Sequence, residues 1–148
     1  MQNQESNIAM CVVIGEGKPD WSKIPWRDYV TKKRQYFHPF GRNGWPADPP
    51  NYLAFRWEGL LRSIHHVDSY EVVDPLYSKV PEIRKKAWGE DEGAYIMYDL
   101  GLAIVSAKEV TNGKIYATAR VTAAFDLLLT CDTISEAVRQ TRERLGGE

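Results

Sequence analysis

The sequence predicts a small α+β fold of about six mostly antiparallel strands, closed by helices at its C-terminal end. Three observations predict it. At 148 residues the chain has the length of one ordinary domain, so we expect residues 1–148 to share a single core. Short apolar runs alternate with turn signals through most of the chain, and only its last part changes to helical spacing.

The chain opens with a predicted buried strand. Ile8 to Ile14 is apolar and rich in β-branched residues, and it stops at Gly15 and Gly17. Residues 20–30 should form a short helical or irregular piece with an apolar face. Two Gly and three Pro interrupt Phe40 to Pro50, so this stretch should be an ordered loop.

A β-hairpin is predicted at the centre of the chain. Tyr52 to Trp57 alternates apolar and polar residues, which is typical of a half-buried strand. Glu58 and Gly59 supply the turn, and Leu60 to Val67 returns as the partner strand. Tyr70 to Val73 should prolong that partner past a bulge.

Residues after the hairpin alternate between charged loop and strand. Asp74 to Gly93 is charged and punctuated by Pro, and Pro81 to Trp88 within it should form one or two helical turns. Ala94 to Leu100 and Leu102 to Val110 are two predicted strands separated at Gly101. Further strands are therefore expected well beyond the central hairpin.

Asn112 followed by Gly113 is the strongest short hairpin signal in the chain. We expect it to join the strand before it to a strand at Ile115 to Val121. Ala123 to Leu129 is then a predicted short helix.

The last predicted element is an amphipathic helix from Thr133 to Leu145. Its apolar residues recur at helical spacing, and Gly146 follows its end. Thr133 and Glu136 match a capping box, in which the Thr hydroxyl accepts from a backbone N–H while the carboxylate reaches back.

Cysteine usage and hydropathy point to the cytoplasm. Cys11 and Cys131 lie in apolar stretches, and we expect two buried free thiols rather than a disulfide. The first residues do not resemble an export signal. The longest apolar run is far shorter than a bilayer span, so no membrane partner is expected.

Charge and aromatic content narrow the function classes. The net charge is −1, which excludes nucleic-acid or membrane binding driven by the charge of the whole molecule. Arg27 to Trp45, however, holds five cations and one acid, interleaved with aromatic rings. Asp68 to Glu92 holds seven acids and four cations. A polyanion site would therefore have to be local.

The stretch Tyr52-Leu53-Ala54-Phe55-Arg56, followed by Ile64-His65-His66-Val67, resembles hairpins in the PUA-like superfamily of small β-barrels, which includes EVE, ASCH, YTH and SRA-type domains. Residues 96–101 and 127–137 resemble the closing part of PUA-like modules found beside bacterial helicases and nucleases. The resemblance covers residues 50–140 and implies a β-barrel whose mouth takes an RNA or DNA base, often a modified one, without catalysis. The chain lacks the opening motif of EVE domains and has an extra N-terminal aromatic segment. The matching hairpin positions are Phe55, Arg56 and Trp57.

The leading functional prediction is a non-catalytic module that binds RNA or single-stranded or modified DNA. Cations in the basic segment would contact phosphates, and its rings would stack on exposed bases. The predicted phosphate contacts are Arg27, Lys33, Arg34 and Arg42. Alternatively, the segment is an ordered loop that covers one end of a barrel.

Trp45 and Trp57 flank the hairpin and are candidate walls of an aromatic cage, although Trp57 shares its face with core positions. Arg56 projects from the other face of the same strand. It would contact phosphate there or pair with a carboxylate such as Asp68 or Glu71.

Two further functions stay open. His65 and His66, with Asp68, are candidate catalytic residues of a small hydrolase or nuclease. Neighbouring residues of a strand point to opposite faces, so the two imidazoles should not share a metal ion, and neither a metal nor a cofactor is expected. Alternatively, the acidic segment Asp74 to Glu92 would bind a protein partner in an assembly.

Overall fold

The computed structural model describes residues 6–89, 92–116 and 119–146. It is a small α+β protein in which hydrogen-bonded pairing links six strands in the order β2-β5-β4-β3-β1-β6. The parallel pair β1–β3 makes the sheet mixed, and its other pairs are antiparallel. Among the described residues β2 and β6 do not pair, so the strands do not close into the expected barrel. Contacts divide the chain into two units, which are described separately.

The first unit contains residues 15–49 and 67–101. Helix α1 (Trp26–Thr31) leads into strand β2 (Gln35–Pro39), which pairs with β5 (Tyr95–Leu100). The second half of β4 (Leu60–Val73) pairs with the other edge of β5, with a register shift between Val67 and Ser69. This irregularity confirms the bulge expected in that strand.

In its described residues, the connection from β4 to β5 contains two three-residue 3₁₀ helices and no longer helix: η1 (Leu76–Ser78) and η2 (Lys85–Ala87). The second lies within the helical turns predicted at 81–88. Such short helices are not stable by themselves. The connection packs through buried Leu76, Val80 and Ile83 into the core of the unit.

The second unit contains residues 2–14, 50–66 and 102–148. β3 (Tyr52–Trp57) pairs with β1 (Ile8–Val13) and with the first half of β4, and β1 pairs with β6 (Val121–Ala124). All four inner residues of β3, from Leu53 to Arg56, are buried. β3 is therefore a central strand buried on both faces, whereas its alternating sequence predicted a half-buried one.

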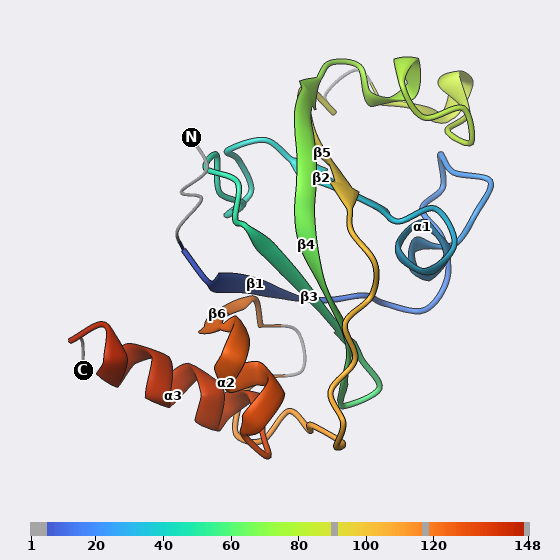
Figure 1. The fold of residues 1–148 in the computed structure, drawn as a ribbon. Helices are drawn as coiled ribbons and strands as arrows, with labels where there is room; N and C mark the ends of the chain where they lie inside the picture. Colours follow the sequence, from blue (N-terminus) through green and yellow to red (C-terminus); the bar gives the residue numbers. More distant parts are fainter. Residues whose placement is uncertain (1–5, 90–91, 117–118, 147–148) are drawn as a thin grey trace. The chain divides into compact units, whose positions relative to one another are not determined.

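Helices α2 (Phe125–Thr130) and α3 (Ile134–Arg144) complete the second unit, and α3 packs against β6 (Figure 1). The Thr141 hydroxyl, buried in α3, accepts from Ala124 N–H at 2.8 Å and donates to Ala137 O. Asp126 of α2 binds Arg144 of α3 through two hydrogen bonds of 2.8 and 2.9 Å. The C-terminal helix predicted from residue 133 is confirmed.

Residues 102–120 do not form the predicted strands in the part that is described. The segment makes only isolated bridges at Ile104 and Thr111. The carbonyls of Thr111 and Asn112 instead accept from the N–H groups of Ile134 and Ser135, at the start of α3. The hairpin prediction was wrong because these carbonyls accept hydrogen bonds from the N–H groups at the start of α3, which have no partner within the helix, instead of pairing with a neighbouring strand. Part of the predicted strand at 115–121 lies outside the described residues.

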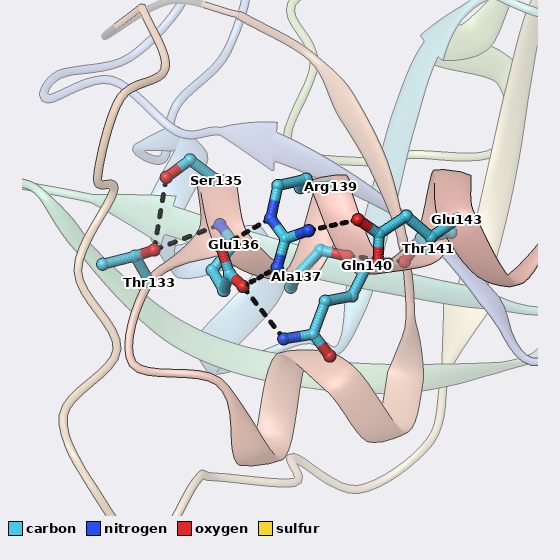
Figure 2. Close-up of polar contacts among 8 residues, drawn as sticks. All are labelled: Thr133, Ser135, Glu136, Ala137, Arg139, Gln140, Thr141 and Glu143. Carbon is cyan, nitrogen blue, oxygen red and sulfur yellow. Dashed lines mark hydrogen bonds and ion pairs between the residues drawn. The ribbon is translucent and has the colours of Figure 1, made fainter. Parts of the chain in front are cut away.

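The first turn of α3 has a partner for each of its N–H groups. Besides the two bonds from residues 111–112, Thr133 Oγ1 accepts from Glu136 N–H at 3.1 Å. The Glu136 carboxylate does not reach back as a full capping box requires. It binds Arg139 and Gln140 along the helix, and Arg139 also binds Glu143 (Figure 2).

Both cysteines are buried free thiols. Burial raises the pKa of the Cys11 thiol to about 12. No helix in the described ranges has the length and apolar character needed to cross a bilayer.

Gly113→Ala should destabilise the protein more than Gly59→Ala does. Both glycines have a positive φ, +70° and +79°, so the backbone strain of an alanine is matched. A Cβ at Gly113 would lie 2.8 Å from Thr133 Cβ and closer still to Ser135 Oγ, whereas a Cβ at Gly59 meets nothing. We expect the Gly113 variant to lose about 1–3 kcal/mol more in urea unfolding. Equal losses would contradict the close approach.

Glu136→Gln should reduce the acid sensitivity of the fold. Hydrogen bonds from Arg139 and then Gln140 lower the pKa of Glu136 from its ordinary 4.5 to about 2. A lowered carboxyl pKa gives stability that is complete above pH 4.5 and is lost as the pH falls towards 2. Urea midpoints measured across this window should fall less steeply in Glu136→Gln. Glu109→Gln, which changes an exposed carboxylate, should leave the slope unchanged.

Candidate functional site

The first unit contains a concave site formed by the connection between β4 and β5. Its volume is about 380 Å³, which is within the usual range of about 300–1,000 Å³ for small-ligand pockets. Two aromatic rings, two charged side chains and two glycines are among the residues that line it. These residues are Asp74, Pro75, Tyr77, Lys85, Trp88, Gly89 and Gly93.

Trp88 forms an aromatic wall that is held from behind. Its ring packs on Trp21 with centroids 4.9 Å apart and on Tyr95 at 5.3 Å. Tyr77 meets it at 6.2 Å with the planes 78° apart. Because Trp88 is only half-buried and lines the pocket, part of this fixed ring is open to a planar ligand.

Asp74 and Lys85 give the pocket one charge of each sign. Both side chains are exposed, and neither makes a hydrogen bond or ion pair with another described residue. Lys85 Nζ lies 5.8 Å from the centroid of the Tyr77 ring, a cation–π contact. The pocket therefore offers an acceptor, a donor and ring surface together.

Arg42 supports the wall of this pocket from the loop that follows β2. Its Nη2 donates to the carbonyls of Glu92 and Ala94, the second at 2.8 Å, and its guanidinium lies 5.4 Å from the Tyr95 ring centroid. A Cβ on Gly93 would come within 3.1 Å of Nη2, and φ there is +67°. Both constraints favour glycine at position 93. Arg42, predicted as a phosphate contact, is committed to backbone carbonyls.

The other cations of the basic segment differ in their surroundings. Lys33 forms an ion pair with Glu82, which brings the end of α1 to the β4–β5 connection. Arg34 is exposed and makes no side-chain hydrogen bond or ion pair to another described residue. Arg27 is half-buried on α1. Of the predicted phosphate contacts, Lys33 and Arg34 are the two most accessible.

Trp45 stacks on buried His38, with centroids 4.4 Å apart and planes 11° apart. His38 Nδ1 lies 2.8 Å from Pro39 O, and Nε2 lies 2.8 Å from the Tyr98 hydroxyl. A carbonyl oxygen can only accept, so Nδ1 carries the proton and Nε2 of a neutral imidazole accepts from Tyr98. Burial raises the pKa of Tyr98, which keeps its hydroxyl a donor.

In the second unit, Arg56 is only 2% exposed. Its Nη2 donates to the carbonyls of Tyr116 and Ala119 at 2.9 and 2.7 Å, in place of the phosphate or carboxylate considered from the sequence. Trp57 is half-buried, with the Arg62 guanidinium 5.7 Å from its ring centroid. Trp45 belongs to the first unit, so each candidate cage ring has partners within its own unit.

The candidate catalytic residues have unlike environments. His65 is 2% exposed, and its Nε2 lies 2.9 Å from the Ser63 hydroxyl. His66 is exposed and meets Tyr52 edge to face at 5.3 Å. Asp68 is exposed. Within the described residues, no group of three or more His, Cys, Asp and Glu side chains is arranged to hold a metal ion.

A pocket of about 270 Å³ also occurs in the second unit, between α3 and residues 114–116, 119 and 121. Lys114, Tyr116 and Arg142 line it, together with Arg139, whose charge is paired with Glu136 and Glu143. The Tyr116 side chain is 86% exposed. The ring at this surface is therefore far less fixed than Trp88 is in the first unit.

The sequence indicated the pocket only weakly. The sequence predicts an acidic partner surface at Asp74 to Glu92, and two of its acids, Glu90 and Asp91, lie outside the described residues. The available signal was the presence of Tyr77 and Trp88 in a charged, Pro-punctuated loop, where no alternating pattern assigns such rings to a core.

No protein-family model matches this chain, and no curated protein or solved structure matches it. The assignment of a site therefore depends on geometry and chemistry alone.

Arg42→Ala should destabilise the protein by about 2–3 kcal/mol, because it removes two hydrogen bonds from a charged donor and the contact with Tyr95. Arg34→Ala, the matched change at an exposed arginine, should stay within about 0.5 kcal/mol of wild type. Urea unfolding measures both. A loss at Arg34 as large as that at Arg42 would contradict the distinction.

Proposed function

We propose that this protein is a non-catalytic nucleic-acid-binding module that takes one base of RNA or single-stranded DNA, modified or not, into the pocket lined by Tyr77 and Trp88. The observation that carries the proposal is the fixed, half-open Trp88 ring beside an accessible lysine. A stacked base gains about 1–3 kcal/mol from such a ring, whatever its sequence. The base site thus lies in the β4–β5 connection instead of at the mouth of a closed barrel.

The charges of the first unit support the proposal. Lys85 lines the pocket, Lys86 follows it on η2, and both are exposed cations that suit phosphate. Arg34 is a further exposed cation in the same unit, whereas Lys33, also exposed, is paired with Glu82. The resemblance to PUA-like domains points the same way, because that superfamily binds bases without catalysis.

The lining of the pocket favours binding over catalysis. Its described side chains include one carboxylate, one ammonium group and two rings, and no nucleophile paired with a base. The buried free thiols suit a reducing compartment, so we place the module in the cytoplasm.

Trp88→Ala should weaken binding of a short, mixed-sequence, single-stranded RNA about tenfold or more, because it removes the stacking wall. Fluorescence anisotropy at low salt measures the affinity. Trp57→Ala, which removes a half-buried ring of the second unit, should bind as wild type does. Lys85→Ala removes an exposed cation and should reduce the slope of log affinity against log salt by about 0.7.

Lys85→Ala disturbs no described packing except its contact with Tyr77, so it tests the pocket even where Trp88→Ala perturbs folding. Unchanged affinity and salt slope in this variant would contradict the proposed site. Loss of binding in Trp57→Ala, with Trp88→Ala unaffected, would place the base site in the second unit instead.

A further inference from the structure

Asp74 is a carboxylate that lines the pocket and makes no hydrogen bond or ion pair with another described residue. An ionised carboxylate can only accept hydrogen bonds. A group in the pocket that donates would therefore be favoured beside it, and a carbonyl would be disfavoured because two acceptors would meet.

Lys85 complements this acceptor. Its ammonium group only donates, and the Tyr77 ring 5.8 Å away supports its position. A ligand that suits both residues carries a donor on one edge and an acceptor or an anionic substituent elsewhere. The Tyr77 and Trp88 rings that line the same pocket favour a planar ligand.

From this arrangement we infer that the pocket selects bases with an exocyclic amino group, which are cytosine, adenine and guanine, over uracil and thymine, with Asp74 accepting from the amino group. The inference rests on the proposed function and adds to it a choice of base. Cytosine and uracil make the sharpest comparison, because they have the same ring size and differ on one edge. Cytosine presents the donors of its amino group there, whereas the one donor of uracil, N3–H, is flanked by two carbonyls that would repel the carboxylate.

The expected preference is moderate because Asp74 is exposed and water competes for its oxygens. Wild type should bind a short cytidine homopolymer about 5–10-fold more tightly than a uridine homopolymer of the same length at neutral pH. Asp74→Asn should bind the two within about twofold of each other, because an amide can turn either its oxygen or its NH₂ to the base.

Asp20→Asn is the matched control, since Asp20 is an exposed carboxylate of the same unit that does not line the pocket. It should keep the cytidine preference of wild type. Equal affinities in wild type, or a preference that survives in Asp74→Asn, would overturn the choice of base and leave the binding function standing. Failure of wild type to bind either polymer would overturn both.

Discussion

The packing of Trp21 against rings from three separate segments is the contact on which the first unit depends. Trp26 comes from α1, Phe37 from β2 and Trp88 from the β4–β5 connection, and their centroids lie 4.9 to 6.0 Å from that of Trp21. The helices in the described part of the connection are single turns, so its shape there comes from these tertiary contacts. The same aromatic packing that forms the core therefore also fixes the pocket wall. Most of the aromatic residues of the chain lie in this unit.

The elements that the sequence predicts well are those whose apolar residues follow a clear strand or helix spacing. β1, β3, β4, β5 and α3 were all predicted close to their observed bounds. β2 was missed because its residues were read as part of the basic and aromatic segment. The strands expected at 102–121 do not form for a different reason. Asn112 and Gly113 carry a strong local turn signal, but backbone carbonyls at this turn accept hydrogen bonds from N–H groups at the start of α3. Local chemistry cannot reveal a partner twenty residues away.

The functional residues were harder to predict than the fold, because the roles of two candidate arginines depend on backbone carbonyls. Arg42 and Arg56 both donate to carbonyl oxygens, which every residue possesses, so no pattern in the sequence separates them from accessible Arg34. Trp45 could not be placed beforehand because its partner, His38, lies on a strand that was not expected. The pocket residues themselves lie in a loop where periodicity carries no information, and only the tertiary contacts of Trp88 show that its ring is fixed.

The close contact between Trp21 and Trp88 also has an optical consequence. Two indoles whose centres are 4.9 Å apart and whose planes are 68° apart should couple their excited states and give a paired signal of opposite sign in circular dichroism. One of these indoles lies in the core and the other lines the pocket. The first unit therefore contains a built-in chromophore pair that responds to whatever touches Trp88, so occupancy of the pocket can be followed in the unlabelled protein.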